Sequence, residues 1–303
     1  MEAWRSKTRK MLPMSKTRLN LGCGRHIHAD WLNIDKVALC EGVIAHDLCI
    51  GIPHDNDSAD VVYHSHMLEH LTPSQARLFA KECYRVLRPG GIMRVVVPDL
   101  EGVVREYLAQ FDAALQGVPG ATSRYAWMML ELYDQTVREK EGGAMLDYLC
   151  ASEPEDKGYA FQRAGEDLRE LAKWETASRN AMAGSAPRKF AGLRYVARCI
   201  RNVLARPSAL REALVKRMLG AEYELLELGR FRRHGEIHLW MYDRYSLATV
   251  LVEAGFRDVR KVDYMESRIP EWPRYALDSD SVGAPRKPGS LYMEASKVEA
   301  GTV

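Results

Sequence analysis

The stretch RLNLGCGRHIHADWLNID, residues 18–35, decides how the rest of the chain is arranged. Residues 19–21 predict a short buried strand, and the Gly-Cys-Gly turn of residues 22–24 follows without a spacer. Two glycines at the end of a strand let the backbone turn sharply and let a ligand approach it closely. Residues 31–34 predict a second strand, which ends at Asp35. In doubly wound folds, a glycine turn after one strand and a carboxylate after the next hold the ribose of a nucleoside.

Length and composition describe an ordinary globular chain of 303 residues, with 47% hydrophobic and 28% charged residues. The net charge of +2 gives no overall field that points to nucleic acid or membrane. The six cysteines are scattered and form no CxxC pair, which favours reduced thiols in a cytosolic protein over disulfides or a zinc site. No apolar run approaches the ~20 residues of a membrane span. Residues 1–17 predict a flexible basic tail, because they lack the apolar core of a signal peptide.

Strand and helix signals alternate along residues 18–98, which predicts a parallel α/β sheet. After the first two strands, further strands are expected at residues 42–46, 60–63 and 92–97, and a helix at residues 73–87. Thr72 and Pro73 are suited to begin that helix, and the RPGG sequence after it to end it. Residues 237–303 return to the same pattern. We expect a helix at residues 243–254, strands at 259–264 and 291–297, and a long connection at 269–288.

Residues 99–236 interrupt this alternation with helical patterns alone. The expected helices span residues 100–116, 124–138, 165–182, 187–205 and 208–219. An insertion of this size between a sheet strand and the next core helix predicts a helical lid over the strand ends. The chain therefore divides into a tail, a first core part (18–98), a helical insertion (99–236) and a second core part (237–303).

The order of these pieces resembles the class I S-adenosylmethionine-dependent methyltransferases. The likeness is closest to their type 11 branch and its bacterial relatives, which are often associated with cell-surface saccharides. Seven segments carry it, of which RVLRPGG is the most specific: LNLGCG (19–24), NID (33–35), HDL (46–48), DNDSADVVYHSHMLEHL (55–71), ECYRVLRPGG (82–91), VVVPDL (95–100) and SLATVLVEAGF (246–256). The resemblance implies a doubly wound, mostly parallel sheet with an antiparallel last strand. It covers residues 18–101 and 238–298 and leaves the insertion unexplained.

The resemblance also implies a set of residues that bind S-adenosylmethionine. Gly22, Cys23 and Gly24 would lie beside the methionine part of the donor, and Asp35 would hold the ribose hydroxyls. The adenine would be bordered by Asp47 and Leu48, and the sulfonium would lie near His64. Asn20, in the strand before the glycine turn, is also expected to bind the donor. Asn20 departs from the family pattern, which has an acid there, and Arg25 and His26 stand where a third glycine is expected.

The first crossover connection is unusually short. Asp35 follows Gly24 by eleven positions, against ~20 in dinucleotide folds. Parallel strands normally need a crossover of about a dozen residues. We therefore expect the first helix to be shortened to a turn or absent. A dinucleotide needs that helix N-terminus for its pyrophosphate, whereas S-adenosylmethionine carries no phosphate.

Candidate catalytic residues lie where strands of an open α/β sheet end, because ligands bind at that edge. The three candidates are His66, His70 and Asp99. A hydroxyl acceptor must lose a proton when it is methylated, and the imidazole of His66 titrates near neutral pH. His66 and His70 share a helical face, but the HExxH arrangement is absent and a third ligand is missing, so no metal site is predicted. For His70 and for the later His238 and Tyr242, structural roles are favoured.

The insertion is locally basic, with twelve Lys or Arg against four Glu over residues 186–234. One interpretation is a lid helix with a solvated basic face. The other is an anionic partner met by residues 187–219, either a phosphate-bearing acceptor or the inner face of the membrane. RNA is less favoured, because aromatic and basic residues are not interleaved. The leading hypothesis is a cytoplasmic enzyme that O-methylates a small or saccharide-like acceptor. The alternatives are an RNA methyltransferase and a non-catalytic adaptor that binds the donor; the oligomeric state is left open.

Overall fold

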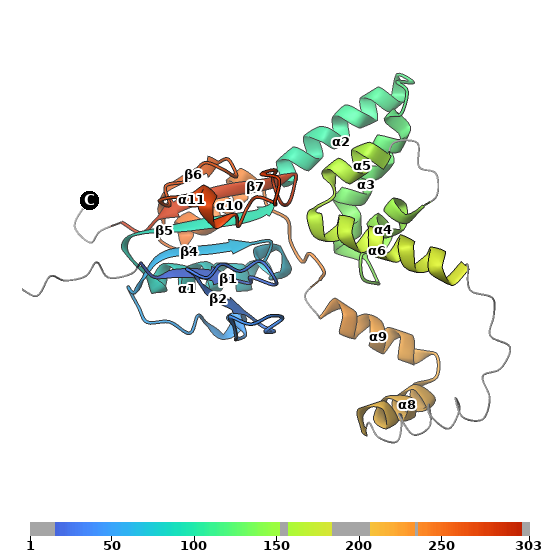
Figure 1. The fold of residues 1–303 in the computed structure, drawn as a ribbon, viewed down its shortest axis with the longest axis horizontal. Helices are drawn as coiled ribbons and strands as arrows, with labels where there is room; N and C mark the ends of the chain where they lie inside the picture. Colours follow the sequence, from blue (N-terminus) through green and yellow to red (C-terminus); the bar gives the residue numbers. More distant parts are fainter. Residues whose placement is uncertain (1–15, 152–156, 184–206, 234–235, 299–303) are drawn as a thin grey trace, which may run out of the picture. The chain divides into compact units, whose positions relative to one another are not determined.

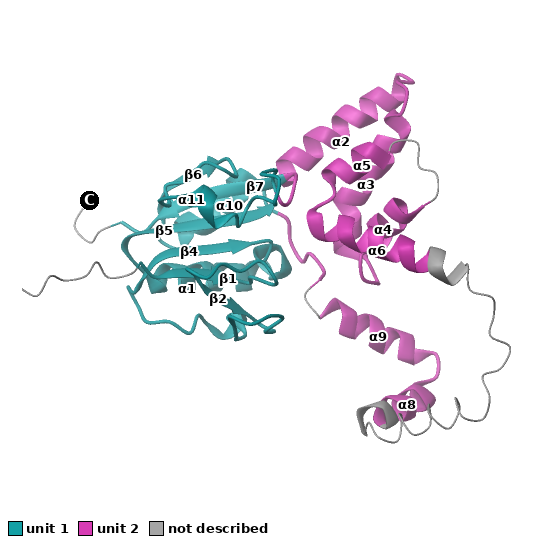
Figure 2. Ribbon diagram, in the orientation of Figure 1, with its two compact units in different colours: residues 1–98, 242–285, 290–303 teal, residues 99–241, 286–289 magenta. Residues whose placement is uncertain are grey.

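The computed structural model describes residues 16–151, 157–183, 207–233 and 236–298. The chain forms two compact units, shown in different colours in Figure 2. The first comprises residues 1–98, 242–285 and 290–303 and is called here the α/β unit. The second comprises residues 99–241 and 286–289 and is called the helical unit.

The α/β unit is built on one seven-stranded sheet in the order β3-β2-β1-β4-β5-β7-β6 (Figure 1). Its strands are β1 (Arg18–Leu21), β2 (Leu32–Asp35), β3 (Val43–Ala45), β4 (Ala59–Ser65), β5 (Leu87–Pro98), β6 (Arg257–Val262) and β7 (Ser290–Ser296). Strands β1 to β5 pair in parallel, whereas β7 runs antiparallel to both β5 and β6. The predicted α/β class, with an antiparallel last strand, is confirmed. Strand order reverses between β1 and β4, the place where open α/β sheets bind ligands.

The connection between β1 and β2 contains turns and no helix, as its length predicted. Buried side-chain amides stabilise it in place of helical hydrogen bonds. Asn33 donates to the carbonyls of His28 and Trp31, at 3.1 and 3.0 Å. The backbone polar groups of a buried turn need hydrogen-bond partners. These amides supply them, so the crossover is stable without a helix.

One face of the sheet carries the main apolar core. Helix α1 (Pro73–Val86) begins with a capping box between Thr72 and Gln75, and it ends where β5 starts. Apolar residues at helical spacing bury one side of α1 against the sheet: Ala76, Phe79, Ala80, Cys83 and Val86. Helix α10 (Arg244–Glu253) packs beside it and adds Leu247, Val250 and Leu251.

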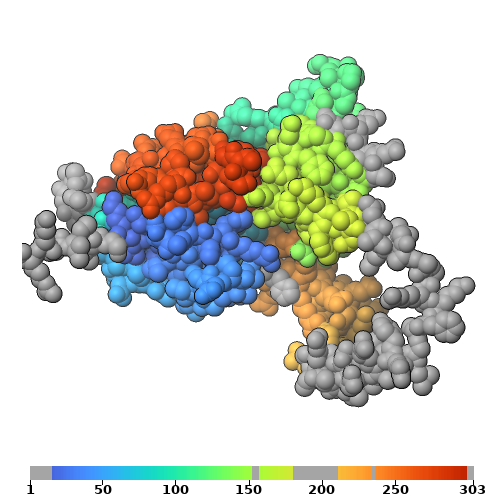
Figure 3. Space-filling view, in the orientation of Figure 1, coloured from blue at the N-terminus to red at the C-terminus, as the bar shows by residue number. Residues whose placement is uncertain are grey.

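The opposite face is covered by the C-terminal part of the chain rather than by long helices. Trp31 there meets the aromatic rings of Trp272 and Tyr275, at centroid distances of 6.2 and 5.3 Å. Both belong to the short helix α11 (Trp272–Tyr275). Figure 3 shows the two ends of the chain side by side on this unit, in blue and in orange to red. Two 3-10 helices, η1 (Leu48–Ile50) and η2 (Leu68–His70), complete the unit.

The helical unit has a separate core, in which the largest buried side chain is Trp127. Its helices are α2 (Leu100–Leu115), α3 (Ala121–Val137), α4 (Gly143–Cys150), α5 (Lys157–Arg163), α6 (Glu166–Ala183), α8 (Pro207–Leu219) and α9 (Glu222–Arg232). Four of the expected helices are present, whereas the one expected at residues 187–205 lies outside the described residues. Helices α4, α5 and α9 were not expected. No helix in the described ranges has the length and apolar character of a bilayer span. The role of this unit as a lid stays a prediction.

Candidate active site

The glycine turn after β1 is held against the sheet and leaves one backbone position open. Gly22 donates its N–H to the carbonyl of Ile34 at 2.8 Å. A Cβ on Gly22 would lie 2.8 Å from Cγ of Met67, and its φ of +65° also favours glycine. Gly24 has a φ of +53°, but a Cβ there would meet nothing within 4 Å. Gly22 is therefore needed for packing, while the backbone at Gly24 is open to a ligand.

Asp35 ends β2 beside this turn. Its Oδ2 accepts the N–H of Gly24 at 2.8 Å, and its Oδ1 accepts the N–H of Val37 at 3.3 Å. A carboxylate has about four acceptor sites. The partly exposed Asp35 thus orders the glycine turn and keeps the capacity to accept ribose hydroxyls.

Two predicted donor-binding residues, Asn20 and Cys23, have structural roles in this region, and their contact with a donor stays a prediction. The buried Asn20 donates through Nδ2 to the carbonyl of His26 and to Oδ1 of Asn33, both at 2.9 Å. Both amide hydrogens are therefore used to hold the β1–β2 connection. The Cys23 side chain is also buried, and burial, followed by the charge of Asp35, raises the pKa of its thiol to about 12. Cys23 is an unreactive packing residue in this turn.

The segment after β3 combines an acidic cap with an apolar anchor. Asp47 accepts the backbone N–H of Cys49 at 2.9 Å, which lowers the pKa of its carboxyl group, and it lies 3.6 Å from Nζ of Lys36. Leu48 is buried in the main core. The Leu48 side chain anchors this segment to the core. Of Asp47 and Leu48, only Asp47 therefore has a polar side chain near the sheet edge.

His64 is a buried, neutral histidine near the end of β4. It pairs with Leu21 of β1 and Val95 of β5, and its ring lies edge-on to Phe79 of α1 at 5.2 Å. Among the described residues, neither of its ring nitrogens has a hydrogen-bond partner. Burial lowers the pKa of His64 to about 4, and the nearby charge of Glu69 offsets this only in part.

His66 lies just beyond β4, and both of its ring nitrogens have partners. Its backbone is left-handed, with a φ of +50°, and its N–H donates to the carbonyl of Val96 at 2.9 Å. Nδ1 lies 3.1 Å from Oε1 of Glu69, and Nε2 lies 2.8 Å from Oγ of Ser290. The His66 side chain keeps 15% of its surface exposed, whereas that of Glu69 is fully buried. Left-handed residues other than glycine are uncommon and cluster at functional sites.

Glu69, Ser290 and Tyr242 were not predicted as site residues. The charge of Glu69 acts on His64, as above, and on Tyr242. Burial, followed by that charge, raises the pKa of Tyr242 to about 12. The Tyr242 hydroxyl has no hydrogen-bond partner in the described part of the chain. Position i+3 from His66 was the only sequence signal for Glu69. Ser290 follows His66 by 224 residues, so no local pattern links the two.

The other two predicted catalytic residues are less favourably placed. His70 ends η2, and its N–H donates to the carbonyl of Met67 at 3.2 Å. Asp99 belongs to the helical unit, where it caps α2 by accepting the N–H of Gly102 at 3.2 Å. This cap accounts for an aspartate at that position without a catalytic role.

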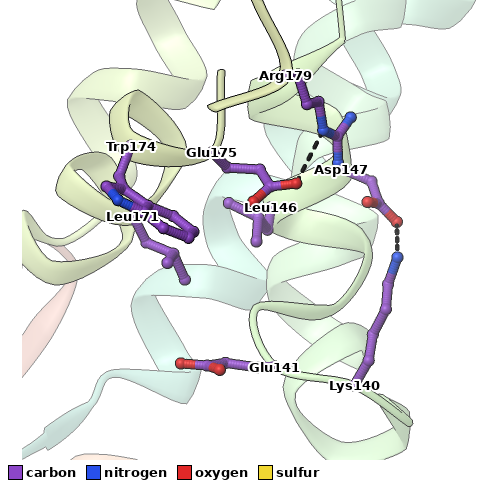
Figure 4. Close-up of a pocket in the computed structure, with 8 residues that line it drawn as sticks. All are labelled: Lys140, Glu141, Leu146, Asp147, Leu171, Trp174, Glu175 and Arg179. Atoms are coloured by element: carbon purple, nitrogen blue, oxygen red, sulfur yellow. Dashed lines mark hydrogen bonds and ion pairs between the residues drawn. The ribbon is translucent and has the colours of Figure 1, made fainter. Parts of the chain in front are cut away.

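The helical unit contains a separate cavity of about 220 Å³ (Figure 4). Leu146, Leu171 and Trp174 form its apolar part. The ion pairs Lys140–Asp147 and Glu175–Arg179 border it, with atoms 2.7 and 2.9 Å apart. None of the predicted site residues lines it.

The sheet-edge site suits a nucleoside that carries a positive charge and no phosphate. The backbone at Gly24 is open and Asp35 has spare acceptors, and their role in binding a nucleoside stays a prediction. Asp35 at the end of β2 and Glu69 of η2 each contribute a carboxylate. No helix N-terminus follows β1 to bind a pyrophosphate.

Residues 19–95 match the family model described as a methyltransferase domain. In this sequence match and in its strand order, the α/β unit resembles a class I S-adenosylmethionine-dependent methyltransferase domain. The match contains the glycine turn, Asp35 and β4, and the strand order agrees with it. S-adenosylmethionine is accordingly the cofactor of this domain.

Solved structures resemble the whole chain more weakly. A SAM-dependent methyltransferase from Archaeoglobus fulgidus is 12% identical, with 93% of this chain and 86% of that chain covered and a TM-score of 0.36. A methyltransferase from Mesorhizobium loti, also described as S-adenosylmethionine dependent, is 13% identical, with 95% and 94% covered and a TM-score of 0.35. A comparison with curated protein sequences gave no match. The assignment rests on the family match and the strand order.

Proposed function

We propose that this methyltransferase domain transfers a methyl group to a hydroxyl of a small or saccharide-like acceptor in the cytoplasm. The observation that carries the proposal is the position of His66. Met67, the next residue, packs on Gly22, and Leu21 before the glycine turn pairs with His64 on β4. The histidine therefore lies at the same sheet edge as the donor-binding turn.

The donor-binding residues in this proposal are Gly22, Gly24, Asp35 and Asp47. The turn leaves its backbone open at Gly24, Asp35 accepts hydrogen bonds from the ribose, and Asp47 borders the adenine. When bound, S-adenosylmethionine supplies the methyl group as an electrophile on a positively charged sulfur. That charge disappears during the transfer, so a dry, well-aligned site promotes the reaction better than a strong acid would. The neutral, buried His64 keeps this part of the site dry.

The catalytic role falls to His66, because an attacking hydroxyl must lose its proton as the new bond forms. A positioned base typically contributes 10²–10⁴-fold to such a step. Of the three predicted catalytic residues, we choose His66, because its partly exposed ring directly follows β4 and lies between Glu69 and Ser290. His70 and Asp99 are not part of the proposed mechanism.

The test measures release of S-adenosylhomocysteine with a panel of hydroxyl and amine acceptors, from saccharides to RNA. His66→Ala should lower turnover by about 10²–10⁴-fold while it keeps donor affinity. His54→Ala, in the loop that precedes β4 at the opposite end of the strand, is the matched control. Normal turnover in His66→Ala would exclude a base at this position. Turnover on RNA alone would favour the RNA methyltransferase, and donor binding without turnover would favour an adaptor.

A further inference from the structure

Three side chains of the α/β unit lie in a row, joined by a close carboxylate–imidazole contact and by one hydrogen bond. The row ends at the partly exposed Ser290. The buried Glu69 of η2 faces Nδ1 of His66 at 3.1 Å. Nε2 of the same ring lies 2.8 Å from Oγ of Ser290, the first residue of β7. A carboxylate, an imidazole and a hydroxyl in this order are the arrangement that activates a hydroxyl for loss of its proton.

The chemistry of Glu69 decides which nitrogen of His66 carries the proton. An ionised carboxylate only accepts hydrogen bonds, so the nitrogen beside it must be the donor. The neutral ring then holds its hydrogen on Nδ1 and its lone pair on Nε2. Ser290, whose hydroxyl both donates and accepts, donates to that lone pair.

We propose that Glu69 and Ser290 are positioning residues that make Nε2 of His66 the proton acceptor for a hydroxyl substrate. Glu69 fixes the ring in the Nδ1–H tautomer. The Ser290 hydroxyl occupies the hydrogen-bonding position at Nε2 and is displaced from it by the hydroxyl of the acceptor. This inference rests on the proposed function and adds to it the two residues that orient the ring of His66.

The transfer step then balances without any further reactant. The acceptor oxygen forms its bond to the methyl carbon as the carbon–sulfur bond breaks, and the electron pair of the broken bond stays on sulfur. The proton of the acceptor hydroxyl passes to Nε2, so His66 becomes an imidazolium that the Glu69 carboxylate stabilises. The ring later returns this proton to water. A neutral amine can attack through its own lone pair and lose its proton afterwards, so it does not require this row.

Backbone constraints keep the row in place. His66 is held left-handed by the hydrogen bond from its N–H to Val96, and the first pair of the β5–β7 ladder joins Ser290 to Pro98. Glu69 has no exposed surface and so cannot swing into water. The ring is thus fixed between two elements that approach it from distant parts of the sequence.

Nitrogen NMR of the full chain with ¹⁵N-labelled histidine tests the tautomer directly, with and without S-adenosylhomocysteine. His66→Asn identifies the signals of His66. We expect a protonated Nδ1 and an unprotonated Nε2 at neutral pH. Glu69→Gln keeps the shape but can donate to Nδ1, so it should move the proton to Nε2. A wild-type ring that is protonated on Nε2, or on both nitrogens, would overturn the proposal.

Turnover and donor affinity separate this proposal from the proposed function. Glu69→Gln should keep the affinity for S-adenosylhomocysteine and lower turnover on alcohols by about 10²–10⁴-fold, because the proton sits on the wrong nitrogen. Ser290→Ala should keep the donor affinity and the Nδ1–H tautomer, which Glu69 sets, and should lower turnover less than Glu69→Gln does. A Ser290→Ala variant without turnover would make the serine a reacting group and contradict its role here. Failure of the wild type to bind S-adenosylhomocysteine would refute the proposed function, while the tautomer would still be measured.

Discussion

Tyr63 and His64 are neighbours on β4, and their polar groups lie on opposite, buried faces of the sheet. The group of Tyr63 has hydrogen-bond partners, whereas that of His64 has none among the described residues. The Tyr63 hydroxyl donates to Oδ1 of Asp278 at 2.7 Å. Asp278 also accepts from Nε of Arg94 at 2.8 Å. The other N–H groups of the fully buried Arg94 donate to Glu294 and to the carbonyls of residues 263, 264 and 266. Every donor of this guanidinium is satisfied.

On the other face, His64 and the Tyr242 hydroxyl are equally buried but have no hydrogen-bond partner in the described residues. A buried polar group without a partner costs about 1–3 kcal/mol, so chains rarely keep one without a function. The hydrogen-bonded cluster around Arg94 has a structural role, because it joins the segment 263–279 to the sheet. The unsatisfied groups lie on the face that includes Glu69, and no contact among the described residues accounts for them.

The largest effect should come from breaking the satisfied cluster. Arg94→Met leaves the buried carboxylate of Asp278 without its cation and removes the buried cation of Glu294, which keeps only the more exposed Arg268 and Arg260 nearby. We expect a loss of about 3–5 kcal/mol in the free energy of unfolding, measured by urea denaturation. Arg77→Met, which removes an exposed pair with Glu253, is the control and should cost less than about 1 kcal/mol. Equal, small losses in both variants would contradict a structural role for the Arg94 cluster.

The unsatisfied face should respond to pH. Above pH 6.5, His64 is neutral in both the folded and the unfolded chain and adds no pH dependence. As the pH falls from 6.5 to about 4, His64 becomes protonated in the unfolded chain but stays neutral in the folded chain. The free energy of unfolding therefore decreases. The share of His64 in this loss should reach about 3 kcal/mol at pH 4. His64→Leu should remove that share, and identical pH profiles for variant and wild type would show that His64 titrates normally.

A smaller gain is expected at Tyr242. Tyr242→Phe removes a buried hydroxyl that has no partner in the described residues, so thermal or urea unfolding should show a stability gain of about 1 kcal/mol. In contrast, Tyr63→Phe removes a hydroxyl bonded to Asp278 and should destabilise by a similar amount. A loss in both variants would mean that the two hydroxyls are equally well satisfied.

A last effect concerns exposed charges of the helical unit. Lys216 and Arg217 lie in the last turn of α8, beside the exposed Leu214 and Met218. If residues 187–219 meet an anionic membrane, vesicles with anionic lipid should retain the chain and salt should release it. Changing Lys216 and Arg217 to Glu should weaken retention by about 1 kcal/mol each. Equal retention on neutral vesicles would leave only a structural role for these charges.

The sequence predicted those parts of the fold that depend on local pattern. The β-branched and apolar runs predicted the strands of the sheet, and the spacing from Gly24 to Asp35 predicted the helix-free crossover. Thr72 and Pro73 predicted the start of α1. Short helices such as α4 and α5 were missed, because eight and seven residues give too few turns for a periodic signal.

The site was less predictable, because its pairings depend on strand register. Arg94 and Asp278 are 184 residues apart. A single arginine in a β-branched run gives no sequence signal that identifies its partner. Asn20 occupies a position where the family resemblance implied a donor ligand, yet it serves the β1–β2 connection. Asp99 was judged by its place after β5, although an aspartate that begins a helix is more simply a cap.

Calorimetric titration with S-adenosylhomocysteine tests the central claim, that the ends of β1, β2 and β4 form the donor site. The wild type should bind, and Asp35→Ala should weaken binding by about 1.5–3 kcal/mol, because hydrogen bonds to a charged group are lost. Asp30→Ala, in the same connection but exposed and paired with Arg274, should bind as the wild type does. Unchanged affinity in Asp35→Ala, or no binding by the wild type, would contradict the claim.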